Sequence, residues 1–199
     1  MEIFFWSTLA FFSASVPWSL IIGFLVSKKD IRKVGDSNPG STNVLKAGGW
    51  KVGLIAILVD IGKAFFPVYF SLIYGINSWG LVIVSTSAIS GSLFSPFLKF
   101  NGGKSLAVTL GIWLAISYGI IGPIICLMMA FSHLIQRVHV WTIIFGFSGI
   151  LLWILIFSLN IQLITLWSIN IVMVMLLKHR AELRQKVIFR DWISSGGRA

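Results

Sequence analysis

The chain of 199 residues is long enough for one domain, and it is 57% hydrophobic but only 11% charged, with a mean hydropathy of +0.92. Soluble domains carry about 25% charged residues, so a water-soluble fold of this length is excluded. The net charge of +10 would suggest nucleic acid in a soluble protein. In an apolar chain it indicates loops that face anionic lipid headgroups and phosphorylated substrates.

Apolar stretches along the chain predict an all-α integral membrane protein, since a membrane-spanning helix needs about 20 such residues. The first stretch is too long for a signal peptide, and its charges follow it instead of preceding it. Three stretches are short and the boundary near Gly119 and Pro123 is ambiguous, so six spans remain an alternative to seven. The predicted bundle of about seven transmembrane helices has spans at 3–27, 51–75, 79–97, 105–120, 121–136, 139–158 and 161–177.

The charge distribution favours seven spans. With that number, every Lys and Arg except Lys63 falls in the loops of one side, together with the C-terminal tail. The positive-inside rule then places the N-terminus outside and the C-terminus in the cytoplasm. We expect one transmembrane domain over residues 1–186, followed by a basic, flexible tail over 187–199.

The first basic loop runs from Lys28 to about Trp50 and contains, from Gly35 to Asn43, a segment rich in glycine, serine, threonine and asparagine. Small residues allow backbone N–H groups to converge on one point, and such nests bind anions. Lys46 lies close enough to supply a positive charge. An ordinary turn-rich loop would have a similar composition, so both interpretations stay open.

The second basic loop contains Gly102-Gly103-Lys104-Ser105 before a predicted helix. A Walker motif would need a glycine where Leu98 stands, and no strand precedes the loop, so nucleotide hydrolysis is excluded. Glycine amides and a lysine at a helix N-terminus still suit a phosphate group. The alternative is a tight turn with a lysine that only orients the protein.

Two further groups of ionisable residues are candidates. His179 and Arg180 follow the last span, either as a basic flank or as part of a binding site in which His179 donates or accepts a proton. Asp60 and Lys63 lie three residues apart on one face of the second span. They form either an ion pair within the bundle or a direct contact with substrate, because lone charges there are costly.

The sequence lacks the residue patterns that several classes of reaction require. The single cysteine, Cys126, excludes an internal disulfide and a cysteine metal cluster. We find no convincing serine–histidine–acid order, no glycosidase carboxylate pair and no metal-ligand spacing, so no cofactor or metal is expected. What remains is a basic face for phosphate groups beside an apolar bundle that can hold an acyl chain.

These motifs, in this order, resemble the bacterial acyl-phosphate-dependent glycerol-3-phosphate acyltransferase family over about residues 5–186. Gly35 to Asn43 is similar to the family's Gly-Ser-x-Asn-x-Gly-Ala-Thr-Asn pattern, and Gly91 to Lys104 to its second motif. Asp60, Lys63 and Pro67 match a segment between them, and His179-Arg180 matches the third motif.

The resemblance implies a multi-pass enzyme of the bacterial inner membrane with a cytoplasmic active face. Its substrates would be acyl phosphate and glycerol 3-phosphate, its products lysophosphatidic acid and phosphate, and its surroundings membrane lipids without nucleic acid. Lys104 and His179 would be catalytic, and Asp60 and Lys63 would support the site. The expected substrate-binding residues are Asp36, Ser37, Asn38, Gly40, Thr42, Asn43, Lys46, Gly102, Gly103, Ser105, Arg180 and Glu182.

The sequence also departs from the family pattern. Asp36 replaces a serine, Lys46 an arginine, Ser92 a histidine, Ser105 a glycine and Glu182 an asparagine. These departures favour the alternative of a non-catalytic or substrate-altered homologue that binds phosphorylated lipid precursors. A small transporter is a further alternative, but it would carry ionisable groups along its path, and only two lie within a predicted span.

Overall fold

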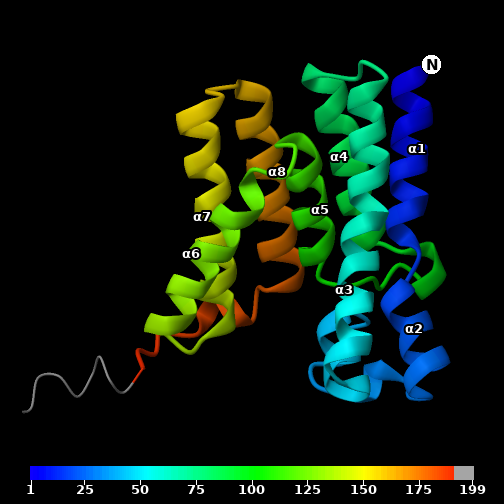
Figure 1. Cartoon of the computed structure of the whole chain (residues 1–199), viewed down its shortest axis with the longest axis vertical. Helices are drawn as coiled ribbons and strands as arrows, with labels where there is room; N and C mark the ends of the chain where they lie inside the picture. The colour runs from blue at the N-terminus through cyan, green and yellow to red at the C-terminus, as the bar shows by residue number, and fades with distance from the viewer. Residues whose placement is uncertain (191–199) are drawn as a thin grey trace, which may run out of the picture. The chain divides into compact units, whose positions relative to one another are not determined.

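The computed structural model describes residues 1–190, and within that range every regular element is helical (Figure 1). Five apolar segments are long enough to cross a membrane, namely 2–27, 41–73, 78–98, 139–157 and 161–178. All seven predicted stretches contain helix, while seven spans and the orientation remain predictions. The helices are α1 (Glu2–Ser15), α2 (Trp18–Ser27), α3 (Ser41–Ile73), α4 (Ser78–Leu93), α5 (Leu106–Ile116), α6 (Ile121–Ile135), α7 (His139–Phe157) and α8 (Ile161–Lys178), with short 3₁₀ helices η1 (Ile31–Lys33), η2 (Pro96–Leu98) and η3 (Glu182–Arg184).

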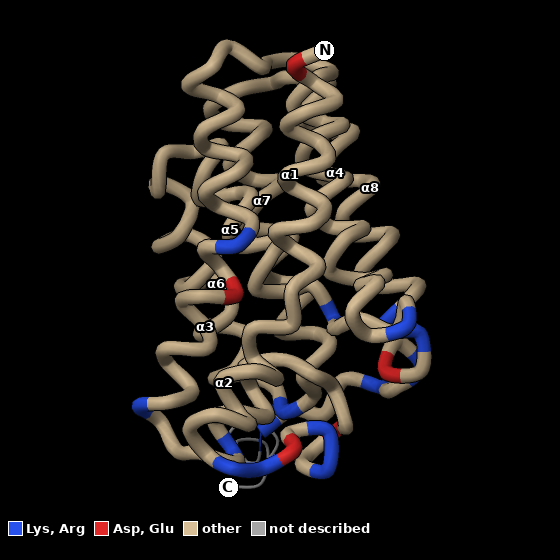
Figure 2. The backbone as a smooth tube through the Cα atoms, turned by 90° about the vertical axis from the view of Figure 1, so that its right-hand side faces the viewer, with Lys and Arg blue, Asp and Glu red and all other residues tan. Residues whose placement is uncertain are grey.

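The chain divides into two compact units, the first from Met1 to Ile116 and the second from Ser117 onward. In the first unit, α1 packs on α4 while α2 and α5 pack on α3. In the second unit, α7 packs on both α6 and α8. Apart from Lys63, which lies beside Asp60 inside α3, the Lys and Arg positions of the first unit gather toward the end that holds α2, away from the N-terminus (Figure 2).

The first predicted span, 3–27, is confirmed as one apolar segment long enough to cross a membrane, but it consists of the two helices α1 and α2. Val16 is extended (φ −61°, ψ 124°), and Pro17 has no N–H to continue the helical hydrogen bonds. The carbonyl oxygen of Val16 accepts from the Trp18 N–H at 3.0 Å and from the Lys63 Nζ at 3.2 Å. A side chain of α3 therefore adds a second hydrogen bond to a backbone group at the break.

Glycines allow close helix contacts in the first unit. A Cβ at Gly91 of α4 would collide with the carbonyl oxygen of Phe11 in α1, and one at Gly111 of α5 would collide with that of Ile61 in α3. Small residues at such points let backbones approach, which is the main source of packing between helices in lipid. These contacts hold the two basic loops of the first unit on one scaffold.

In the second unit, a polar network joins α6 to α7. The buried Gln136 donates to Ser132 and Thr142 at 2.9 Å each, and its Oε1 accepts from the Val138 N–H. The segment after η3 is tied to this turn, because the Arg190 N–H donates to Ile135 O and the Arg137 N–H to Ile188 O, both at 2.9 Å.

The tail predicted to be flexible from residue 187 is therefore held in place over residues 187–190. This prediction is wrong there because backbone pairing with the α6–α7 turn fixes the chain, including an isolated bridge between Gln136 and Phe189. The rest of the predicted tail, 191–199, lies outside the described residues.

Candidate functional site: two polar clusters

The loop before α3 turns the Asp36 carboxylate back toward the helix start. Gly35 and Ser37, on either side of it, both have left-handed backbone (φ 64° and 61°). The Asp36 Oδ1 accepts from the Asn38 N–H at 3.2 Å and from the Asn43 Nδ2 at 3.0 Å. Two donors, one of them a backbone N–H, therefore converge on the Asp36 carboxylate.

Asn43 fixes the shape of this loop from the first turn of α3. Its side chain is buried, and Nδ2 also donates to the Asn38 carbonyl oxygen at 2.8 Å. Its Oδ1 forms no hydrogen bond within the described part of the chain. A Cβ at Gly35 would collide with this oxygen and lie 3.0 Å from the Lys46 Nζ, so Lys46 lies beside the turn. A larger residue at Gly35 would therefore displace both side chains.

The other predicted residues of this loop play smaller parts. Thr42 is exposed, and Ser37 is exposed at the left-handed position of the turn. Gly40 precedes Ser41 as the N-cap of α3, and a Cβ there would lie 2.7 Å from the Asn38 Nδ2. Ser37 and Gly40 shape the turn, while Asp36, Asn38 and Asn43 supply its polar contacts.

The second basic loop corrects one expectation. The N–H groups of Gly102 and Gly103 donate to the carbonyl oxygens of Leu93 and Ser92 at 3.0 and 3.1 Å. These amides therefore form hydrogen bonds at the end of α4. The sequence had suggested that they would bind a phosphate group. They anchor the loop instead, directly before Lys104.

Ser105 follows Lys104 in a strained conformation. Its φ is +62°, a region that residues with a Cβ rarely adopt. The side chain is buried, and Oγ forms no hydrogen bond within residues 1–190. Strain of this kind next to a functional side chain is common where a loop must hold one geometry.

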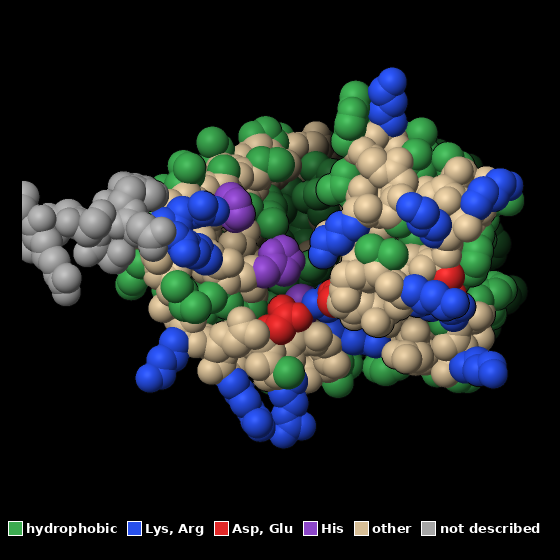
Figure 3. Space-filling view, turned by 90° about the horizontal axis from the view of Figure 1, so that it is seen from below, with side chains coloured by type: hydrophobic (Ala, Val, Ile, Leu, Met, Phe, Trp, Pro, Cys, Tyr) green, Lys and Arg blue, Asp and Glu red, His purple; other side chains and the backbone are tan. Residues whose placement is uncertain are grey.

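Lys104 and Asp36 join the two loops, because the Lys104 Nζ lies 3.0 Å from the Asp36 Oδ2. Partial burial raises the pKa of Asp36, but hydrogen bonds from Lys104, Asn38 and Asn43 outweigh it and lower that pKa from 3.8 to about 2. Asp36 is therefore ionised at neutral pH. Figure 3 looks onto the end of the protein where basic side chains project and acidic ones lie among them.

The second unit holds the other predicted cluster, at the end of α8. His179 caps this helix, is fully buried, and its Nδ1 lies 2.9 Å from the Glu182 Oε2. A carboxylate at Nδ1 keeps a proton on that nitrogen and orients the ring. The His179 Nε2 has no hydrogen-bond partner in the described part of the chain. Arg180 is exposed next to it.

Asp60 and Lys63 form the ion pair that was one of the two sequence interpretations, with 3.0 Å between the Asp60 Oδ1 and the Lys63 Nζ. The Ser19 hydroxyl of α2 also donates to Asp60, and the Ser13 hydroxyl of α1 donates to the Lys63 carbonyl oxygen. Neither serine was predicted from the sequence, because nothing in their spacing marks them. This cluster ties α3 to the broken first span.

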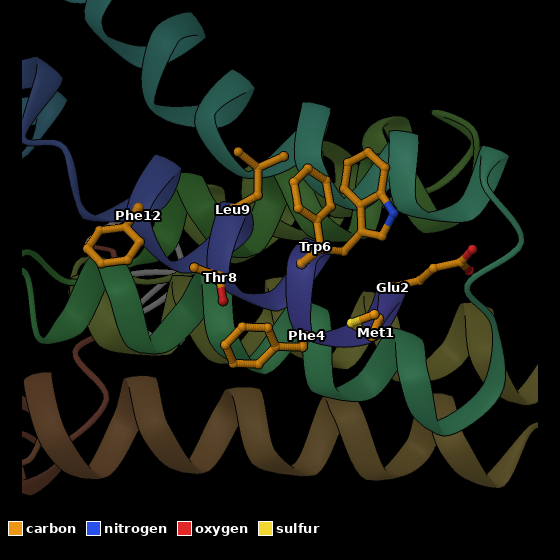
Figure 4. A pocket seen from close by; sticks show the side chains of 8 residues that line it. Met1, Glu2, Phe4, Trp6, Thr8, Leu9 and Phe12 are labelled. Atoms are coloured by element: carbon orange, nitrogen blue, oxygen red, sulfur yellow. The ribbon is translucent and has the colours of Figure 1, made fainter.

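A pocket of about 570 Å³ lies along α1 and contains no basic residue (Figure 4). Its lining is almost wholly apolar, with Glu2 as the one charged residue. The pocket belongs to the N-terminal end of the first unit, so it is not a phosphate site. The lining residues are Met1, Glu2, Phe4, Phe5, Trp6, Thr8, Leu9 and Phe12.

Solved structures similar to this chain include the integral membrane glycerol 3-phosphate acyltransferase PlsY. Its glycerol 3-phosphate form has a TM-score of 0.83 at 24% identity and covers 92% of each chain. Its lysophosphatidic acid form has a TM-score of 0.75 at 23% identity, covering 94% of this chain and 95% of the other. These structures show that the fold is shared.

Relatives identified by sequence carry the same name, glycerol-3-phosphate acyltransferase, as the solved structures. A glycerol-3-phosphate acyltransferase of Leptospira borgpetersenii serovar Hardjo-bovis (strain JB197) is 41% identical over 130 residues, which is 64% of this chain and 57% of the relative. Glycerol-3-phosphate acyltransferase 1 of Thermotoga maritima is 42% identical over 113 residues, 55% of each. The chain thus spans little more than half the length of these relatives.

The family resemblance carried by the loop motifs is confirmed by a match that extends beyond them. The family model described as glycerol-3-phosphate acyltransferase matches residues 4–187, from the first helix through the His179 cluster. Because that match includes both basic loops, the ion pair of α3 and the end of α8, this chain belongs to the glycerol-3-phosphate acyltransferase family.

Proposed function

We propose that this protein transfers a fatty acyl group from acyl phosphate to glycerol 3-phosphate, giving lysophosphatidic acid and inorganic phosphate. The observation that carries the proposal is the cluster around Lys104. There the Lys104 ammonium, the Asn38 N–H and the Asn43 side-chain amide contact the Asp36 carboxylate. The same donors suit a phosphate group. Membership of the family supplies the substrate class.

The proposed reaction needs no nucleophilic residue. Acyl phosphate is a mixed anhydride with an activated carbonyl carbon. A hydroxyl oxygen of glycerol 3-phosphate attacks that carbon, the bond to the phosphate oxygen breaks, and inorganic phosphate leaves. The hydroxyl proton passes to a phosphate oxygen of a substrate. Catalysis then comes mainly from positioning and from stabilising negative charge.

Within this scheme each cluster has a distinct task. Lys104 and Lys46 neutralise phosphate charge, and Asn43 keeps the loop in shape. In the second unit, Glu182 orients the His179 ring through Nδ1, and Arg180 supplies an exposed positive charge next to it. The apolar helices hold the acyl tail. The site faces the cytoplasm of a bacterial inner membrane in a bundle of about seven spans.

The test is product formation in proteoliposomes with defined acyl phosphate, acyl-CoA and acyl carrier protein donors. We expect lysophosphatidic acid only with acyl phosphate, in a one-to-one ratio to released phosphate. No product with any donor, from a preparation whose folding is checked by its thermal transition, would rule out the activity. Product from acyl-CoA alone would overturn the proposed donor.

A second candidate is a non-catalytic homologue that binds phosphorylated lipid precursors. The observation that favours it is the Asp36 carboxylate at Lys104, since an enzyme's substrate has to compete with it. This candidate predicts that glycerol 3-phosphate raises the melting temperature while no product forms with any donor.

A further inference from the structure

Asp36 makes the contacts that a bound anion would make. The Lys104 ammonium contacts one of its oxygens, while the Asn38 N–H and the Asn43 amide contact the other. One donor is a cation, one a backbone amide and one a side-chain amide. This mixture is typical of protein sites for phosphate and carboxylate.

We infer that Asp36 is an internal occupant of the phosphate site, which a substrate phosphate must displace from Lys104. Asp36 thus sets the concentration of phosphorylated substrate at which the site fills. The inference rests on the proposed function for the identity of that substrate.

The surroundings of Asp36 allow such an exchange. Its side chain is 49% exposed, so the carboxylate can rotate into solvent, and the contact with Asn43 that it gives up is only partly buried. The Asn43 amide would not follow, because it is buried and also donates to the Asn38 carbonyl oxygen. The loop therefore keeps its donors when the carboxylate leaves.

Protonation is not a route to release. The pKa of Asp36 is held at about 2, where partial burial is outweighed by the donors around it, so the carboxylate stays charged under physiological conditions. Competition between anions is what empties the site. A partly exposed ion pair contributes modestly, so the barrier to exchange is small.

The experiment compares the Asp36→Asn variant with the wild-type protein, both full-length and in detergent, using inorganic phosphate and glycerol 3-phosphate as probes in calorimetric titrations. The introduced amide keeps an oxygen for Asn38 and Asn43 but no longer neutralises Lys104. We expect both probes to bind about two- to fivefold more tightly, the size expected for one such ion pair. In turnover assays the same factor should appear as a lower KM for glycerol 3-phosphate.

Asp30→Asn is the matched control. Asp30 lies in the same loop region and pairs with Arg32 at 2.8 Å, so its replacement removes an equal charge away from Lys104. We expect no gain in phosphate affinity. An equal gain would mean that net charge alone is responsible, and the inference would fail.

Asp36→Ser repeats the test if the asparagine variant does not fold, as judged by its melting curve. Unchanged or weaker phosphate binding in a folded Asp36 variant would overturn the inference. A gain that persists in a Lys104→Met background would also overturn it. If the wild-type protein forms no product but Asp36→Asn tightens phosphate binding, the proposed function fails and the inference stands.

Discussion

Two ion pairs of the first unit have the same separation and opposite surroundings. Asp36 and Lys104 lie 3.0 Å apart with side chains 49% and 19% exposed, and Asp60 and Lys63 lie 3.0 Å apart with side chains 7% and 10% exposed. Breaking a buried pair leaves an uncompensated charge, whereas water or another ion can replace a partner in an exposed pair. The comparison teaches that the degree of burial distinguishes the two kinds of ion pair. A buried pair stabilises the packing of helices, whereas a ligand can replace one partner of an exposed pair.

Removing one partner of the buried pair should have the largest effect. Lys63→Met leaves the Asp60 carboxylate and the Val16 carbonyl oxygen without the ammonium. We expect a loss of about 3–5 kcal/mol in stability, measured as a lower melting temperature in detergent. Lys51→Met, an exposed site on the same helix, serves as the control. Equal melting temperatures for the two variants would contradict a structural role for the pair.

Removing the cation of the exposed pair should instead affect activity. Lys104→Met should lower kcat/KM by about 10²- to 10³-fold, a loss of roughly 3–4 kcal/mol in transition-state stabilisation. The melting temperature should change little, since the pair is partly solvated. Lys99→Met removes an exposed lysine from the same loop and should keep full activity. Comparable losses in both variants would refute a specific role for Lys104.

A smaller effect is expected beside the exposed pair. Ser105→Gly relieves a φ of +62° and removes a buried hydroxyl without a hydrogen bond, so we expect a gain of up to about 1 kcal/mol in stability. Ser41→Gly, at the helical start of α3, should instead destabilise the protein. The melting temperatures of both variants, compared with that of the wild type, test this prediction. A lower melting temperature for Ser105→Gly would show that the strain interpretation is wrong.

The smallest effect is the pH dependence of the exposed pair. The folded-state pKa of Asp36 is lowered from 3.8 to about 2, so its contribution is complete above pH 4 and is lost as the pH falls toward 2. Because the side chain is half exposed, the contribution is less than about 1 kcal/mol. The difference in melting temperature between wild type and Asp36→Asn should narrow over that range. A constant difference would exclude the ionised carboxylate as its source.

Much of the fold could be predicted from the lengths of the apolar segments, but the break in the first span could not. Pro17 ends a helix, whereas Pro67 lies inside α3 without ending it. A proline therefore does not decide the matter by itself. The Val16 carbonyl oxygen at the break also accepts a hydrogen bond from Lys63, which is distant in the sequence. Local patterns carry no information about such a partner.

The candidate site was predictable as a set of loops but not as a set of contacts. The family motifs identified Asp36, Lys104 and His179 by position. That Asp36 contacts Lys104, and that the Gly103 amide donates to Ser92 at the end of α4, depends on how α3 and α4 bring two loops together. By contrast, the Asp60–Lys63 pair was predictable because one helix turn joins its members.

The break at Val16 also constrains the order in which the protein can mature. A chain is made from its N-terminus, so the first apolar segment leaves the ribosome before Lys63, which is 47 residues further along. Until α3 arrives, the Val16 carbonyl oxygen accepts only the local hydrogen bond from the Trp18 N–H, at 3.0 Å. The second hydrogen bond to this oxygen, from Lys63, therefore forms only after α3 has been made.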